Sequence, residues 1–109
     1  AAAAKAGQRL VVMIDASHAN SSKKPENQPL VMQDVADQIA AGDARIMGVM
    51  VESNLVAGRQ DLVDGATLTY GQSITDGCID WETSIGVLEN LAEAVAKRRA
   101  AQSATKLTA

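Results

Sequence analysis

The chain has 109 residues, which allows one domain at most, and its hydrophobic residues amount to 47% without any phenylalanine. A net charge of -3 and a pI near 5.0 argue against the basic surface of a nucleic-acid-binding domain. The single cysteine, Cys78, cannot form an internal disulfide and favours a reducing compartment, and no apolar run approaches the roughly 18 residues of a membrane span. We therefore expect a cytoplasmic protein with neither nucleic-acid nor membrane partners.

The first half of the chain predicts a strand, a helix and a second strand. Arg9 to Ile14 is a continuous apolar run, the pattern of a strand buried on both faces as in a parallel sheet. Pro29 to Ala41 places apolar side chains at helical spacing, with Gly42 where a helix cap is expected. Arg45 to Val51 predicts a second buried strand. Because short connections join these elements, they form a βαβ unit, and the fold class is α/β.

The second half predicts a long connection, a short strand and a long helix. Residues 53–72 form a long loop or hairpin insertion, which could carry function or be a surface excursion. Ser73 to Asp76 predicts a third strand, and Asp80 can cap a helix from about Trp81 to Ala101. The basic residues 97–99 suit its solvated end, and residues 103–109 look frayed. Helical spacing puts these side chains on its buried face: Ile85, Leu88, Leu91, Ala92 and Val95.

Three potential metal ligands fall at the ends of the expected strands. His18 follows the first strand, Glu52 closes the second and Asp76 ends the third. Parallel strands present such residues at one edge of a sheet, where α/β folds place ligands, and an imidazole with two carboxylates suits Mn, Fe, Co or Zn. Taken singly, each could instead be an ordinary loop, cap or solvated residue. Cys78 fits a small buried residue better than a thiolate ligand.

The loop after the first strand carries side chains that could bind an anion. A phosphate or carboxylate could be held by hydroxyl and amine groups: Ser17, Ser21, Ser22, Lys23 and Lys24. The same composition is typical of a solvated, turn-forming loop, and of the two interpretations we favour this one.

Three stretches of the chain resemble a known enzyme family. MIDASHANSSK, IMGVMVESNLVAGRQ and LTYGQSITDGCIDWE are similar to the C-terminal part of the type I 3-deoxy-D-arabino-heptulosonate 7-phosphate (DAHP) synthases. The resemblance implies a (β/α)8 barrel, of which this chain would form the last three βα units. It also implies that His18, Glu52 and Asp76 are metal ligands, and that Asp76 is catalytic and binds the sugar phosphate. The family's further ligand, an upstream cysteine, has no counterpart here.

The activity that this resemblance implies is the condensation of phosphoenolpyruvate with erythrose 4-phosphate, the first step of the shikimate pathway of aromatic amino acid biosynthesis. A divalent metal would polarise the sugar aldehyde, and the full-length enzyme would be a homo-oligomer. We expect a fragment that is inactive alone, because one ligand and the family's phosphate-binding basic residues are missing; its alanine-rich start also resembles the end of a helix. The alternatives are a non-catalytic, barrel-derived binding or structural protein and a related phosphoenolpyruvate-using sugar-acid synthase.

Overall fold

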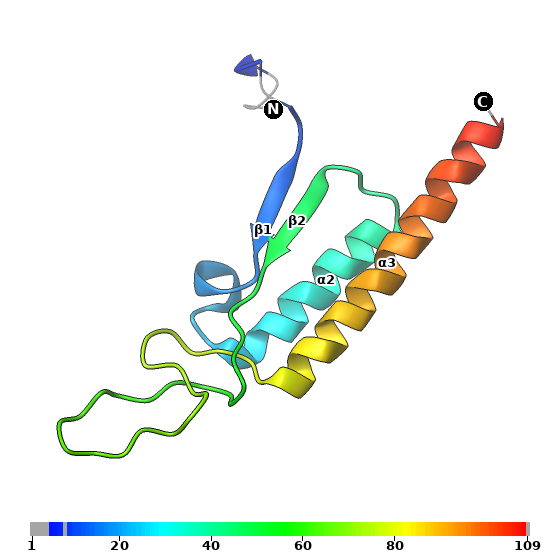
Figure 1. The fold of residues 1–109 in the computed structure, drawn as a ribbon. Coiled ribbons are helices and arrows are strands. Elements are labelled where there is room, and N and C mark those ends of the chain that lie inside the picture. Colours follow the sequence, from blue (N-terminus) through cyan, green and yellow to red (C-terminus); the bar gives the residue numbers. More distant parts are fainter. Residues whose placement is uncertain (1–4, 8, 109) are drawn as a thin grey trace.

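The protein folds into two parallel strands with two helices on one side. The computed structural model describes residues 5–7 and 9–108, so the alanines at 1–4 lie outside the described residues. Strand β1 (Val12–Asp15) pairs in parallel with β2 (Ile46–Met50), and helix α2 (Gln28–Ala40) connects them. Helix α3 (Trp81–Thr108) packs along α2, and both helices run opposite to the strands (Figure 1). The predicted βαβ order is confirmed.

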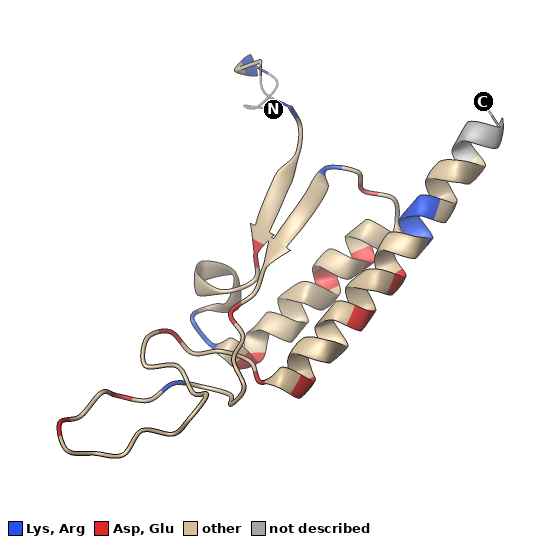
Figure 2. Ribbon diagram, in the orientation of Figure 1, with Lys and Arg blue, Asp and Glu red and all other residues tan. Residues whose placement is uncertain are grey.

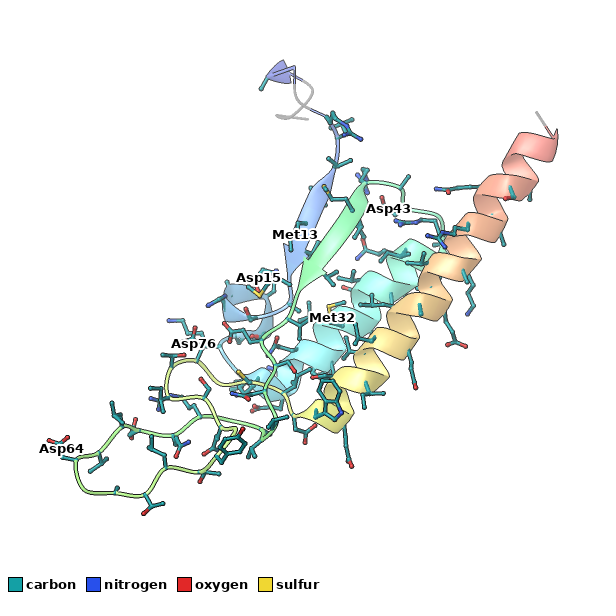
Figure 3. The ribbon with its side chains drawn as sticks, in the orientation of Figure 1. Met13, Asp15, Met32, Asp43, Asp64 and Asp76 are labelled. Atoms are coloured by element: carbon teal, nitrogen blue, oxygen red, sulfur yellow. The ribbon has the colours of Figure 1, made fainter. Side chains whose placement is uncertain are left out.

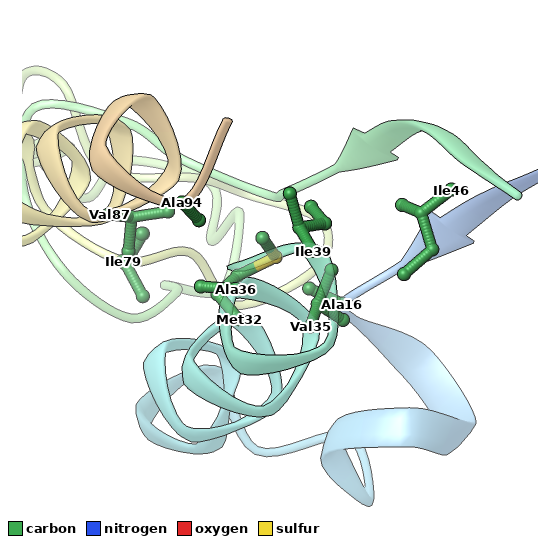
Figure 4. Packing of buried hydrophobic residues seen from close by; sticks show 9 residues of the cluster. All are labelled: Ala16, Met32, Val35, Ala36, Ile39, Ile46, Ile79, Val87 and Ala94. Atoms are coloured by element: carbon green, nitrogen blue, oxygen red, sulfur yellow. The ribbon is translucent and has the colours of Figure 1, made fainter. Parts of the chain in front are cut away.

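The core lies between the strand pair and the helices. Residues of α2 supply its centre at the helical spacing that the sequence predicts, and Gly42 follows that helix with a positive φ of 106° that glycine tolerates. Met32 and Gln28 are the largest fully buried side chains. Figure 4 shows the apolar members of the core, which are Ala16, Met32, Val35, Ala36, Ile39, Ile46, Ile79, Val87 and Ala94.

The strands are not buried on both faces, so that prediction is wrong. Met13 is 64% exposed and Met47 is 70% exposed. Helix α2 lies along the opposite face with α3 packed beside it, and the sheet of the described residues contains two strands. The fold class is therefore α/β, as predicted, with a small parallel sheet.

The third strand predicted at Ser73 to Asp76 is also wrong. Between β2 and α3 the described chain makes isolated bridges rather than a ladder, and residue 73 pairs with the loop at residue 59 instead of with β2. The parallel contact with the chain beyond β2 comes later, where the N–H of Ile79 donates to the carbonyl of Glu52 at 3.0 Å. Because a strand needs a continuous hydrogen-bonded neighbour, Asp76 lies in a loop. Residues 53–72 form a long irregular loop that projects beyond the strand ends (Figure 1).

Helix α3 begins as predicted and ends later. The carboxylate of Asp80 accepts the N–H of Thr83 at 2.8 Å, which is the expected cap. The helix continues to Thr108 instead of fraying from Ser103. Its buried apolar residues include Val87 and Ala94, which belong to the core cluster together with residues of α2. The predicted buried face is wrong for three residues, which are exposed: Ile85, Leu88 and Ala92.

Arg98 joins α3 to the start of β2. Its Nη1 donates to the carbonyl oxygens of Asp43 and Ile46, each at 2.9 Å. The prediction of a solvated basic helix end is therefore wrong for this residue. Two short 3-10 helices complete the fold between β1 and α2, η1 (His18–Ser21) and η2 (Pro25–Asn27).

Candidate metal centre

His18, Glu52 and Asp76 meet beyond the carboxyl ends of the two strands. Nε2 of His18 lies 3.2 Å from Oε1 of Glu52 and 3.3 Å from Oδ2 of Asp76. One potential ligand atom from each residue lies within 4.8 Å of the other two. Figure 2 shows this gathering of acidic positions near the strand ends, with basic positions in the connection between β1 and α2. The structure thus brings together all three residues that the sequence predicts as ligands.

A sharply turned loop presents His18. The residue has a positive φ of 51°, and Ser22 and Lys23 follow with φ values of 56° and 60°. Few residues other than glycine adopt this left-handed conformation, and it is concentrated at functional sites. The N–H of Lys23 donates to the carbonyl of His18 at 2.7 Å, which closes the turn.

The last residue of β1, Asp15, orients the His18 ring. Oδ2 of Asp15 lies 2.9 Å from Nδ1 of His18, on the opposite side of the ring from the two carboxylates of the cluster. Its Oδ1 accepts the backbone N–H of Ser17 at 2.8 Å and the Ser17 hydroxyl. Figure 3 shows Asp15 and Asp76 in the same region of the fold, one from β1 and the other from the loop ahead of α3. The sequence analysis missed this residue.

A buried amide holds Glu52. Gln28, at the start of α2, is fully buried, and its Nε2 donates to the carbonyl of Glu52 at 3.0 Å. The N–H of Glu52 donates in return to Oε1 of Gln28 at 2.8 Å. The sequence analysis missed Gln28 as well, although a polar residue in line with the apolar stripe of α2 was a signal that could have found it.

An arginine holds the loop that carries Asp76. Nε of Arg59 donates to the carbonyl of Thr75 at 2.7 Å, and its Nη2 pairs with Asp61 at 2.9 Å. Asp76 itself is the most exposed of the three candidate ligands, with 67% of its side chain accessible, against 19% for Glu52. Asp15 thus holds the His18 ring, Gln28 holds the backbone of Glu52, and Arg59 holds the residue before Asp76.

The electrostatics of the cluster favour a cation. The hydrogen bond to Asp15 raises the pKa of His18, and the bond to Asp76 raises it further. Partial burial raises the pKa of the Glu52 carboxyl, and the Asp76 carboxylate beside it adds to the effect. Two carboxylates that repel each other across one imidazole nitrogen would both gain from a shared positive charge.

The donor set and its spacing fit a divalent metal. Ligand atoms sit about 2.0–2.2 Å from such an ion, so two ligands on opposite sides are about 4 Å apart and neighbouring ones are closer. The separations above need only small adjustments to meet that requirement. Cys78 does not join the set: its Sγ donates to the carbonyl of Asp76 at 3.6 Å, and desolvation raises the pKa of the thiol. It is half-buried, where the sequence analysis expected a small buried residue.

A pocket of about 350 Å³ opens beside the cluster. His18, Glu52 and Asp76 line it together with two cationic side chains, Lys23 and Arg59. That volume suits a small molecule, and the two cationic side chains suit one with negative charge. Among the serines and lysines that could bind an anion, three border this pocket, namely Ser17, Ser21 and Lys23.

The fold and the site together define an α/β segment with a candidate metal centre at the strand ends. The family model described as the DAHP synthetase I family matches residues 1–89, and the chain belongs to this family. It is 60% identical over 99 residues to the phospho-2-dehydro-3-deoxyheptonate aldolase of Haemophilus influenzae. The aligned region covers 91% of this chain and 27% of that protein. It is 56% identical over 95 residues to the Phe-sensitive enzyme of the same name from Escherichia coli K12, covering 87% of this chain and 27% of the relative.

A solved structure agrees with these relatives. The phospho-2-dehydro-3-deoxyheptonate aldolase of Francisella tularensis SCHU S4 superposes with a TM-score of 0.76 at 52% identity, covering 81% of this chain and 25% of that one. The chain therefore spans about a quarter of the length of the relatives it matches. Within the described residues, neither long helix is apolar enough along its length to cross a membrane.

Proposed function

We propose that this chain is the metal-binding C-terminal segment of a DAHP synthase, which condenses phosphoenolpyruvate with erythrose 4-phosphate. The observation that carries the proposal is the convergence of His18, Glu52 and Asp76 on one locus in a chain of this family. The bound divalent cation, Mn, Fe, Co or Zn, would act as a Lewis acid toward the sugar aldehyde. In the complete protein the segment would belong to a (β/α)8 barrel within a homo-oligomer, and its loop at 53–72 would lie at the active-site end.

The residues of the chain have separate roles in this proposal. The neutral imidazole of His18 and the carboxylate of Glu52, which is the least exposed of the three candidate ligands, would hold the cation. Asp76, whose side chain is the most exposed of the three, would be both a ligand and a group that contacts the sugar phosphate. Lys23 and Arg59 border the pocket, where their charges would attract phosphorylated substrates.

The reaction forms one carbon–carbon bond and releases phosphate. C3 of phosphoenolpyruvate attacks the aldehyde carbon of erythrose 4-phosphate, whose oxygen becomes a hydroxyl. Water adds at C2, and the C2 phosphate group leaves as inorganic phosphate. The segment contributes by holding the aldehyde end of the sugar at the mouth of the pocket, where Asp76 is accessible.

A chimera tests the proposal with this chain's own residues. The matching 95-residue segment of the Escherichia coli Phe-sensitive relative is replaced by this chain, and phosphate release is measured with both substrates and Mn. We expect turnover that requires both substrates, and a loss of more than about 100-fold for His18→Ala and Glu52→Gln, because ligands matter at least as much as their supporting residues.

The control for these variants is Asp34→Asn, which changes an exposed carboxylate of α2 and should leave turnover unchanged. Circular dichroism and metal content are measured on every variant, so that misfolding is recognised. A folded chimera without activity, or a His18→Ala variant with full activity and full metal content, would contradict the proposal.

A further inference from the structure

The two oxygens of Asp15 have different partners. Oδ1 accepts the backbone N–H of Ser17 at 2.8 Å, and Oδ2 lies 2.9 Å from Nδ1 of His18. The Ser17 hydroxyl, on a residue that is 2% exposed, donates to Oδ1 and lies 2.8 Å from the same Nδ1. Every group that faces Nδ1 can therefore accept a proton from it.

The other ring nitrogen faces acceptors as well. Nε2 lies between the carboxylates of Glu52 and Asp76. A neutral imidazole has a single N–H and cannot donate on both sides, so one side of the ring must present its lone pair. The contacts at Nδ1, 2.9 Å to Asp15 and 2.8 Å to the Ser17 hydroxyl oxygen, are shorter than those at Nε2, which are 3.2 and 3.3 Å. Ser17 also holds the Asp15 carboxylate in place with two hydrogen bonds, so the geometry favours the proton on Nδ1 and the lone pair on Nε2, facing the cluster.

We propose that Asp15 is a positioning residue that fixes neutral His18 as its Nδ1–H tautomer and thereby directs the Nε2 lone pair toward Glu52 and Asp76. The inference extends the proposed function, because a metal ligand needs such a lone pair and is usually oriented by a hydrogen bond to its other nitrogen. Free histidine favours the opposite tautomer, with the proton on Nε2, so the structure must supply the preference.

Replacing Asp15 by asparagine should reverse the tautomer. The backbone N–H of Ser17 can only donate, so the amide oxygen of the new side chain must face it. The amide NH₂ group then faces Nδ1 of His18, and Nδ1 must accept. The ring proton moves to Nε2, where it occupies the nitrogen that a metal would need. Asp15→Ala removes both carboxylate oxygens and should return the His18 ring to the tautomer that free histidine favours, with the proton on Nε2.

The tautomer can be measured directly, because His18 is the single histidine of the chain. The 109-residue chain is labelled with ¹⁵N-histidine, and two-bond proton–nitrogen correlations are recorded without metal at increasing pH until the ¹⁵N shifts show a neutral ring, because Asp15 and Asp76 raise the pKa of His18 above its usual value of about 6.5. We expect a protonated Nδ1 in the original chain and in the matched Asp34→Asn control. We expect a protonated Nε2 in Asp15→Asn and a shift toward it in Asp15→Ala.

The same samples are then titrated with Mn in a calorimeter. Asp15→Asn should weaken binding by about 10- to 100-fold, as is typical for supporting residues of metal sites. A protonated Nε2 in the original chain, or an unchanged tautomer in a folded Asp15→Asn variant, would overturn the inference. If the tautomers follow the expectation but the original chain and its His18→Ala variant bind Mn equally, the role of Asp15 stands and the proposed metal site fails. If Asp15→Asn does not fold, the tautomer of the original chain still decides.

Discussion

Replacing Gln28 by methionine should destabilise the protein and displace Glu52. Gln28 is 0% exposed, and its amide both donates to and accepts from the backbone of Glu52. Methionine has a similar volume and a similar helix propensity, so the change removes the two hydrogen bonds with little effect on packing or on α2. The consequences can therefore be assigned to the lost bonds.

The two lost bonds are not equivalent. The carbonyl of Glu52 keeps a second partner, the N–H of Ile79 at 3.0 Å, whereas the N–H of Glu52 loses the amide oxygen that accepts it. A buried donor without a partner costs about 1–3 kcal/mol, and the second bond is worth about 0.5–1.5 kcal/mol. The added apolar surface of methionine offsets part of this loss. We expect a net destabilisation of about 2 kcal/mol.

Urea unfolding followed by helical circular dichroism measures this effect. The control is Gln38→Met, which makes the same substitution on the exposed face of α2 and should change stability by less than about 0.5 kcal/mol. Calorimetric titration with Mn should show weaker binding for Gln28→Met alone. Equal stability of the two variants would refute the assignment of Gln28 as the residue that holds Glu52.

Two further predictions concern a loop glycine and an ion pair. Gly71 has a φ of 79°, and an added Cβ would lie 2.8 Å from Cβ of Leu55; Gly71→Ala should therefore lower the unfolding free energy more than Gly65→Ala, which has a φ of 78° and open space around it. Equal losses in urea unfolding would contradict this. The Arg45 guanidinium lowers the pKa of Asp43 to about 2, so its contribution to stability should be complete above about pH 4 and be lost as pH falls toward about 2. The difference in unfolding free energy between the original chain and Asp43→Asn should shrink over that range; a constant difference would refute it.

The sequence predicted the elements whose signals are local. The apolar run of β1 and the helical spacing of α2 identify these elements because each pattern is contained in one short segment. The cap at Asp80 was predictable for the same reason. The exposure of Ile85 and Leu88 was not, because spacing shows which residues share a stripe but not which stripe another helix covers. The third strand failed similarly, since a strand depends on a neighbour that local sequence does not specify.

The same distinction between local and long-range signals applies to the candidate site. His18, Glu52 and Asp76 could be selected as candidates from their chemistry, from their places after the predicted strands and from the family resemblance of the motifs around them. Asp15 and Gln28 could not, because their importance lies in hydrogen bonds within a sharply turned loop or between segments that are distant in sequence. Asp76 lies beside His18 and Glu52 as the sequence predicts, but it comes from a loop rather than from the end of a strand.

The three residues that hold the candidate ligands in place all lie within the described chain. Asp15 belongs to β1, Gln28 to the start of α2 and Arg59 to the long loop. The burial of the sheet is less complete, because the exposed side chains of Met13 and Met47 leave one face of the strand pair open to solvent. The polar geometry of the site is thus specified by contacts inside a chain that spans about a quarter of its relatives, whereas the burial of its sheet is not. We therefore expect the candidate ligands to keep their orientation under conditions that weaken hydrophobic packing only while β1 and α2 remain packed together. Loss of the Nδ1–H tautomer of His18 should coincide with the separation of β1 from α2.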